Sequence, residues 1–193
     1  MMQRIHAVGL LAAAALLCSS CTPVVVETPT PTPVATLQCQ GEFTEETHPC
    51  DQAEYDAVAA RDAQYEEAER TFRRVVALLY ELRSQRRPMN DELSGLVSGS
   101  YGQGVEETLH DGLTSDIDFS GQPVVVWVTR ENTSDGGSTL ALQACTAPGT
   151  ATLESNGFKM TPKTYREQLY FTQIDGRLRL SSNRVAEVTS CDG

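Results

Sequence analysis

The sequence lacks an uninterrupted apolar run long enough to cross a bilayer. The apolar run near its start, residues 7–17, has 11 residues and is rich in Ala and Leu, whereas a membrane-spanning helix needs about 20. Basic side chains are also scarce, since 15 Lys and Arg stand against 26 Asp and Glu, a formal net charge of −11. This excess of acid argues against a nucleic acid-binding protein and against a polybasic patch lying on anionic lipid.

Motifs for metal, cofactor and catalytic chemistry are scarce as well. Only His48 and His110 follow the N-terminal apolar run, which is too few for a convincing metal centre without further carboxylates. The stretch GSYGQG has its glycines in the wrong order for a dinucleotide loop, and GLVSG lacks the spacing of a nucleophile elbow. No cofactor or metal is expected, and the sequence favours a protein that is not an enzyme.

The N-terminus has the order of an export signal. Arg4 precedes the apolar run of residues 7–17, and two serines then precede Cys21. This order resembles the signal of bacterial lipoproteins, in which the peptidase cuts before a cysteine whose thiol carries the lipid. The resemblance implies a signal peptide over residues 1–20, lipidation of Cys21 and a position on the outer side of the cell membrane.

Cys18 departs from that pattern, because the position three before the lipidated cysteine is usually Leu. Modification at Cys18 instead would place the bulky Leu17 before the cut, where the signal family prefers Gly, Ala or Ser. Cys21 is therefore the favoured site. An ordinary cleaved signal without lipid is the alternative.

Residues 21–38 form a Thr/Pro-rich tether. The stretch TPVVVETPTPTPVATLQ has four prolines, each of which fixes φ and pushes the preceding residue toward extended geometry. Its 17 residues in polyproline II would reach about 50 Å. The segment resembles the spacer of lipoproteins from high-GC Gram-positive bacteria.

Four cysteines remain beyond the tether, and four cysteines allow three pairings. Cys39 with Cys50 would close a short acidic loop, and Cys145 with Cys191 would join two late strand-like segments. This pattern is favoured because the first loop is cheap to close and an exported chain retains disulfides. A zinc site is disfavoured because no CxxC spacing occurs beyond the tether.

The first half of the domain predicts helices. Residues 52–87 contain neither Pro nor Gly, Asp51 is a fair N-cap and Pro88 is a stop. Arginines at 83, 86 and 87 complement the helix dipole. Apolar residues recur at steps of three and four and so define one face: Phe72, Val75, Val76, Leu79 and Leu82.

Two shorter helices are expected next. Asn90 or Asp91 caps the first, and the second covers residues 105–113 after a stretch interrupted by glycines at 95, 99, 102 and 104.

The second half predicts antiparallel strands. Residues 123–131 are a β-branched run expected to be buried on both faces, and an SDGG turn leads from it into the strand STLALQAC. Asn-Gly at 156–157 and Asp-Gly at 175–176 predict two further hairpins. Helices followed by a meander of strands predict an α+β domain.

The strand sequences VVVWV (124–128), LALQAC (140–145) and TYREQLYF through IDGRLRLSS to VTSC (164–191) resemble the NTF2-like (SnoaL-like, cystatin-like cone) superfamily. The likeness covers about residues 68–191, and is closest to NTF2-like domains of secreted lipoproteins from high-GC Gram-positive bacteria. It implies a long N-terminal helix and shorter helices packed on a strongly curved antiparallel sheet. Residues 39–67 are then a disulfide loop and helical extension, and residues 68–193 are the NTF2-like domain.

The resemblance leaves function open, because this superfamily includes enzymes, carriers and assembly modules. Some relatives are isomerases or cyclases that use a pocket Asp or His, helped by a Tyr. The matching groups here are His110, Asp116, Asp118 and Tyr101, although an acidic chain favours solvent-facing positions for its carboxylates.

Large aromatics of the strand region are candidates for a ligand pocket at the mouth of the cone, or for simple core packing. The pocket candidates are Tyr101, Trp127, Tyr165 and Phe171. The favoured function is a binding or assembly module for a protein, a peptide, a small envelope ligand or a second copy of the chain. A small-molecule isomerase or cyclase is the alternative, and a spacer without ligand is a third.

Overall fold

The computed structural model describes residues 36–132 and 135–192. The predicted signal peptide, Cys21 and most of the tether lie outside this part of the chain. Residues 36–193 belong to one compact unit, so the predicted division at residue 67 falls inside a helix. No helix of the described part is both long and apolar enough to cross a membrane.

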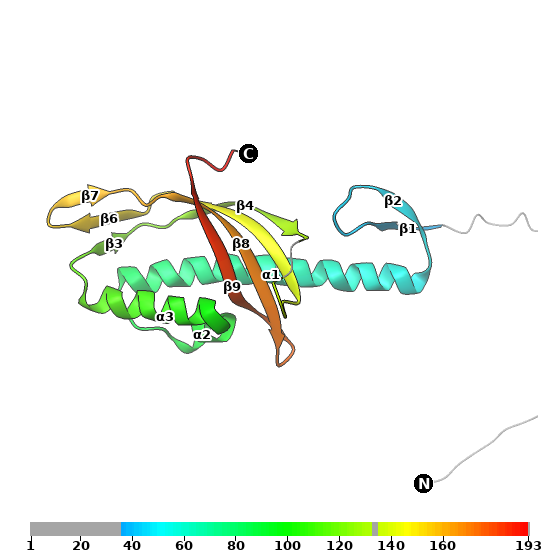
Figure 1. Ribbon diagram of the computed structural model, residues 1–193, viewed down its shortest axis with the longest axis horizontal. Coiled ribbons are helices and arrows are strands. Elements are labelled where there is room, and N and C mark those ends of the chain that lie inside the picture. Colours follow the sequence, from blue (N-terminus) through cyan, green and yellow to red (C-terminus); the bar gives the residue numbers. More distant parts are fainter. Residues whose placement is uncertain (1–35, 133–134, 193) are drawn as a thin grey trace, which may run out of the picture. The chain divides into compact units, whose positions relative to one another are not determined.

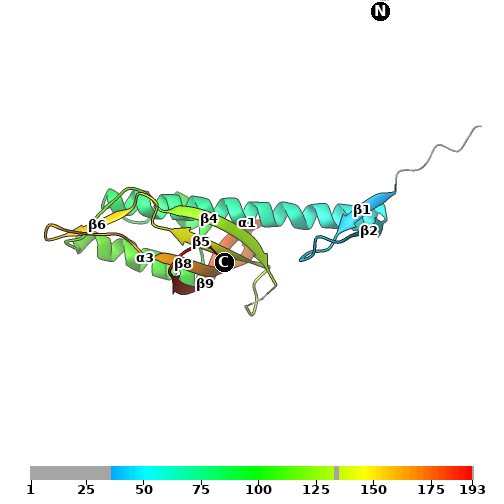
Figure 2. The ribbon, with the colours of Figure 1, turned by 90° about the horizontal axis from the view of Figure 1, so that it is seen from above.

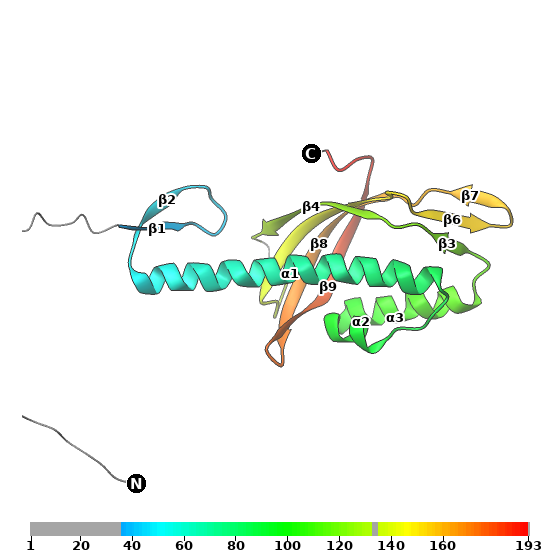
Figure 3. The same ribbon diagram turned by 180° about the vertical axis from the view of Figure 1, so that it is seen from behind.

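A long helix packs on one face of a curved, four-stranded antiparallel sheet (Figure 1 and Figure 3). The helix is α1 (Gln52–Ser84), and the strands are β4 (Val124–Glu131), β5 (Leu140–Ala147), β8 (Thr164–Ile174) and β9 (Arg177–Val188), in that order across the sheet. The predicted α+β class is confirmed.

Helix α1 begins where the sequence predicts and ends three residues early. Asp51 caps its first turn by accepting a hydrogen bond from the backbone N–H of Glu54 at 2.8 Å. At the other end Arg86 adopts a left-handed φ of 49°, and the N–H of Arg87 bonds back to the carbonyl of Leu82 at 2.9 Å. This pattern closes a helix before any proline is reached.

The second and third helices are α2 (Asp91–Leu96) and α3 (Gly99–Thr114). Asn90 caps α2, as expected. The prediction for α3 was too short, because its glycines are part of the helix rather than breaks before it. Gly99 has a φ of +55°, and a Cβ at this residue would lie 2.7 Å from the carbonyl oxygen of Ser181 on β9. A side chain is therefore excluded at Gly99, where the start of α3 touches the sheet backbone.

Two apolar clusters form the core, one between the sheet and α1 and the other between α1 and the two shorter helices. The inner face of the sheet packs on α1 through a fully apolar cluster, whose buried members are Tyr65, Ala68, Phe72, Leu140, Leu142, Ala144, Leu169, Phe171, Leu178 and Leu180. A second cluster joins α1 to α2 and α3 through Val75, Leu78, Leu82, Leu93, Val97, Val105 and Leu109. The apolar helix face predicted from the sequence is therefore the packed face.

Strand β4 is an edge strand, which corrects the prediction that it is buried on both faces. Val124 and Val126 are about half exposed, at 51% and 48%, because β4 has a neighbour on one side only. Its β-branched composition reflects strand propensity here, not full burial.

On the outer face of the sheet the disulfide Cys145–Cys191 fastens the C-terminal segment to β5. Trp127 lies beside it, and its indole Nε1 donates a hydrogen bond to the Cys191 carbonyl at 2.8 Å. The register places Trp127 opposite Cys145 and Cys145 opposite Arg166. This cover seals the outer face near the sheet centre.

A smaller sheet adjoins the end of α1. It contains β3 (Asp118–Ser120), β6 (Thr152–Ser155) and β7 (Phe158–Met160), in the order β3-β6-β7. The β6–β7 turn forms at Asn156-Gly157, as predicted, and both residues have positive φ. Figure 1 shows this sheet beyond the end of the four-stranded one.

A hairpin of β1 (Leu37–Gln40) and β2 (Thr47–Cys50) precedes α1 and packs on its first half (Figure 2). The disulfide Cys39–Cys50 joins its strands. Residues 37 and 38, assigned to the tether from the sequence, are paired in β1. Both disulfides match the favoured pairing, and two disulfides are typical of an exported protein.

Candidate functional site

A cavity of about 430 Å³ lies between the end of α1, the small sheet and the start of β8. We call it the Arg83 groove. Its walls are mostly apolar and aromatic, with two cationic groups: Tyr80, Arg83, Ile117, Phe119, Leu153, Met160, Thr161, Pro162, Lys163 and Tyr165. The volume falls within the range of small-molecule sites, about 300–1,000 Å³.

The secondary structure explains why these residues meet. Tyr80 and Arg83 are three residues apart, so they share one face of α1. Phe119 lies on β3 opposite Leu153 on β6, which brings the small sheet against the end of the helix. Tyr165 adds the third wall from the first residues of β8.

Arg83 is the distinctive group of the groove. Its guanidinium carbon lies 3.6 Å from the centroid of the Phe119 ring, and its Nε is buried without a hydrogen-bond partner. Burial lowers the pKa of Arg83, yet a guanidinium stays protonated at neutral pH. Across residues 36–132 and 135–192 no carboxylate forms an ion pair with it. The groove therefore contains a partly desolvated positive charge that has no carboxylate partner among the described residues.

A polar cluster continues from the groove along the inner face of the sheet. We call it the Glu167 cluster: Tyr101, Thr146, Glu167 and Asn183. The Asn183 amide donates a hydrogen bond to Glu167 Oε2 at 3.0 Å. The Thr146 hydroxyl lies near the same carboxyl but makes no hydrogen bond of normal geometry, although its residue is only 8% exposed.

Burial dominates the electrostatics of this cluster. It raises the pKa of Glu167, and the Asn183 and Thr146 side chains oppose that shift. It also raises the pKa of Tyr101, to which the negative charge of Glu167 adds. Tyr80 connects the cluster to the groove, because its pKa is raised by burial, lowered by the charge of Arg83 and raised again by Tyr165 and Glu167.

The four pocket candidates from the sequence do not all come together. Tyr165 lines the groove and Tyr101 lies in the Glu167 cluster. Phe171 is fully buried in the core under α1. Trp127 is on the opposite face of the sheet beside Cys191, so strand alternation separates it from the others.

The three groups considered as a catalytic base are at the surface. His110, Asp116 and Asp118 are all exposed. Asp118 forms an ion pair with Arg86 at 2.8 Å. Only Asp118 belongs to a strand, since β3 starts there, so the two aspartates do not share a strand face as the sequence suggested. These residues do not form a base in a pocket.

Sequence reasoning missed Arg83 and Glu167. Arg83 was assigned to the helix dipole, although it stands four residues after Leu79, at the margin of the apolar stripe. Glu167 stands two residues before the buried Leu169, and this alternation placed it on the inner face. Both signals were present in the sequence, but an acidic or basic side chain at such a position is usually solvated.

A second cavity, of about 540 Å³, lies where the β1–β2 loop faces α1 and β4. The charges around Tyr65 in this cavity are paired within the protein. Tyr65 donates to Glu42 at 2.7 Å, and burial, followed by this bond and the charge of Glu42, raises the Tyr65 pKa to about 12. Arg130 stacks 4.6 Å from the Tyr65 ring and pairs with Asp62 at 2.9 Å. This region needs no ligand to balance its charges.

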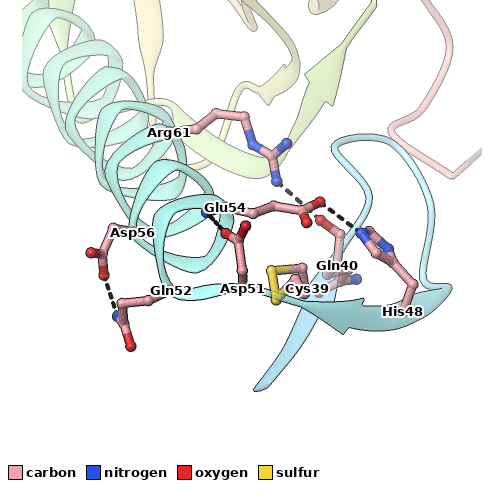
Figure 4. The surroundings of a disulfide bond; sticks show 9 residues. Cys39, Gln40, His48, Asp51, Gln52, Glu54, Asp56 and Arg61 are labelled. Atoms are coloured by element: carbon pink, nitrogen blue, oxygen red, sulfur yellow. Dashed lines mark hydrogen bonds and ion pairs between the residues drawn. A yellow bond between two sulfur atoms is a disulfide. The ribbon is translucent and has the colours of Figure 1, made fainter. Parts of the chain in front are cut away.

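The surroundings of the Cys39–Cys50 disulfide also hold metal-type ligands (Figure 4). One ligand atom each from Cys39, Cys50 and Glu54 lies within 4.8 Å of the others, and His48 bonds Glu54 at 2.8 Å. The two sulfur atoms are bonded to each other, so they cannot act as thiolate ligands. The disulfide joins the two strands of the β1–β2 hairpin, and the His48–Glu54 bond connects that hairpin to α1.

No family model matches the chain, and no curated protein sequence matches it. One similar solved structure is the crystal structure of the intermembrane space region of the chloroplast protein ARC6. It shares 13% sequence identity and a TM-score of 0.39, and the match covers 62% of this chain and 96% of that one. A likeness this distant identifies neither a family nor a function.

Proposed function

We propose that the protein is an exported, lipid-anchored binding protein whose domain, a variant of the NTF2-like cone, takes a small amphiphilic anion in the Arg83 groove. The observation that carries the proposal is the partly buried guanidinium of Arg83, whose Nε is buried and unpartnered and which has no carboxylate partner among the described residues, beside apolar walls. A buried charge is costly unless a partner of opposite sign compensates it. A ligand with an anionic head and an apolar body supplies that partner.

The walls define the ligand class further. Arginine binds carboxylate and phosphate groups in a bidentate fashion, and Phe119 covers one face of the Arg83 guanidinium. Leu153, Met160 and Pro162 offer a surface for an alkyl or flat apolar body. Lys163 is a second cation in the lining, and it forms an exposed ion pair with Glu187 at 2.6 Å.

Calorimetric titration of residues 36–193 tests this proposal with three probes: decanoate, decyl phosphate and decanol. The two anions are expected to bind and the uncharged alcohol to bind far more weakly. Arg83→Met is expected to remove anion binding, while the matched control Arg177→Met, at an exposed arginine on β9, retains it. Equal binding of the alcohol and the anions, or unchanged binding by Arg83→Met, would contradict the proposal.

The anchor is a separate part of the proposal. It is supported by the order of charge, apolar run and small residues before Cys21, by the proline-rich segment that follows, and by two disulfides in the domain. Intact mass analysis of protein from native membranes is expected to find an acylated N-terminal Cys21. An unmodified N-terminus at another residue would refute the anchor.

An isomerase-type enzyme is the second candidate, and Glu167 is the observation that favours it. A carboxyl with a raised pKa beside Tyr101 is suited to removing a proton next to a carbonyl group. If this function holds, a 3-oxodecanoate probe exchanges its C2 protons with D₂O faster in the presence of the protein. Glu167→Gln would abolish that exchange and leave binding intact, whereas the binding-protein proposal expects no exchange above the buffer rate.

A further inference from the structure

The tip of the β6–β7 hairpin displays apolar side chains to solvent. Phe158 is 76% exposed and Met160 is 49% exposed, and Lys159 between them is exposed as well. The two residues of the turn, Asn156 and Gly157, are exposed too. Figure 1 and Figure 2 both show the hairpin extending past the last turns of α1 and α3. The Phe158 side chain is therefore largely uncovered by the described part of the chain, whereas Met160 is about half covered.

The charge of this segment is opposite to that of the whole chain. Residues 155–166 contain Lys159, Lys163 and Arg166 and no acid, and the two lysines are the only lysines in the sequence. Lys159 lies 3.7 Å from Glu154 and Lys163 lies 2.6 Å from Glu187. All four side chains of these pairs are at least 46% exposed, so each pair contributes little and can exchange with another anion.

The tip has too few residues to form a stable protein interface by itself. Stable interfaces use about 20–30 residues on each side, whereas the tip comprises the five residues 156–160. A bilayer surface has no such requirement, since a few apolar side chains inserted at the boundary between headgroups and acyl chains contribute directly. Nearby lysines add about 1 kcal/mol each on anionic lipid.

We infer that the β6–β7 hairpin docks on an anionic lipid bilayer, with Phe158 and Met160 inserted and Lys159 and Lys163 at the lipid phosphates. The acidic net charge argues against a polybasic patch on the chain as a whole. That argument does not apply to the β6–β7 hairpin, because residues 155–166 contain basic residues and no acid. Met160 and Lys163 also line the Arg83 groove, whereas Phe158 and Lys159 do not. The inference is therefore tested through Phe158 and Lys159, which keeps it separate from ligand binding in the groove.

Co-sedimentation of residues 36–193 with vesicles tests the inference. The described unit has its own core and both disulfides, so it is used without the lipid anchor. Binding is expected on phosphatidylcholine–phosphatidylglycerol (1:1) vesicles, with weaker binding on phosphatidylcholine alone. Phe158→Ser is expected to weaken partitioning by about tenfold. The control Val185→Ser, at a 53% exposed valine on β9, is expected to leave it unchanged.

Two further variants keep the test decisive. Lys159→Glu, at a residue outside the groove lining, is expected to reduce binding to the anionic vesicles and not to the neutral ones. Phe158→Trp is expected to be quenched by brominated lipid, above the quenching seen for Trp127 alone. Absence of vesicle binding, equal loss in both serine variants, or dimerisation that Phe158→Ser abolishes would overturn the inference. Arg83→Met should bind vesicles normally, so failure of the groove proposal is recognised separately.

Discussion

Four arginines of the described residues lie over aromatic rings, and the two nearest to their rings, Arg83 and Arg130, differ in whether a carboxylate pairs with them. Arg130 lies over Tyr65 and pairs with Asp62 at 2.9 Å. Arg83 lies over Phe119 and, among the described residues, has no carboxylate partner. The first arrangement is complete within the protein and serves the hairpin end of α1. The second arrangement lacks an anion beside the guanidinium, which is typical of a site that binds an anionic ligand.

The largest expected effect separates the two arginines by ligand affinity. Arg83→Met should weaken decanoate binding by about 100-fold, since loss of one member of a buried charge pair costs about 2–5 kcal/mol. Arg130→Met should change it by less than about twofold, because Arg130 does not line the groove. Parallel calorimetric titrations measure both. Similar losses in the two variants would remove the distinction.

Stability should show the opposite ranking. Arg130→Met is expected to lower the free energy of unfolding by about 1 kcal/mol, since it removes a partly exposed ion pair and a cation–π contact. Arg83→Met should leave stability unchanged or raise it, because it replaces a partly buried charge that has no carboxylate partner among the described residues with an apolar side chain. Urea unfolding of the oxidised proteins provides the values. A clear destabilisation by Arg83→Met would show that Arg83 is structural.

The pH dependence of stability extends the comparison to the partly buried carboxyl group of Glu167. Burial raises the pKa of Glu167 in the folded protein above its ordinary 4.5. At pH values between 4.5 and this raised pKa, the folded state holds a proton that the unfolded state has lost. Glu167 then lowers stability as pH rises through that window. Glu167→Gln should match the wild type at pH 4 and exceed it at pH 7 by on the order of 1 kcal/mol.

Thermal unfolding at the two pH values checks this prediction, with Glu107→Gln, at an exposed residue of α3, as the control. A loss of stability in Glu167→Gln at pH 7 would mean that the carboxylate is favourably paired there. In that case Glu167 would resemble the Arg130 arrangement and not the Arg83 one.

The smallest expected effect concerns the ring under Arg83. Phe119→Leu keeps an apolar wall and removes the cation–π contact, which is worth about 0.5–1 kcal/mol at a partly exposed site. Decanoate affinity should fall about three- to fivefold. A fall as large as that of Arg83→Met would indicate that Phe119 contacts the ligand itself, and an unchanged affinity would indicate that the stacking is incidental.

Much of the fold was predictable because local signals carried it. Asp51 and Asn90 cap their helices with short polar side chains, and the turns at 156–157 and 175–176 contain residues that tolerate positive φ. Long-range contacts were not predictable in this way. Gly99 looked like a helix break in the sequence, because the contact that requires a glycine there is with Ser181 of β9, a strand distant in the sequence.

The candidate site was predictable only in part, for the same reason. Tyr101 and Tyr165 were proposed as pocket residues and lie by the groove or its cluster, whereas Trp127 was proposed with them and lies on the opposite sheet face. Composition identifies an aromatic residue but not the face it takes. That face depends on register, which a bulge between Val125 and Trp127 shifts.

The sequence by itself determined the elements that short-range chemistry controls: the long helix, the tight turns, the α+β class and the favoured disulfide pairs. Tertiary structure alone decided which charged side chains lose their water. Arg83 and Glu167 look like ordinary surface groups in the sequence, and they become distinctive because the small sheet closes on the end of α1 and the strand alternation of β8 turns inward. Desolvation is a property of surroundings assembled from distant segments, so no local pattern records it.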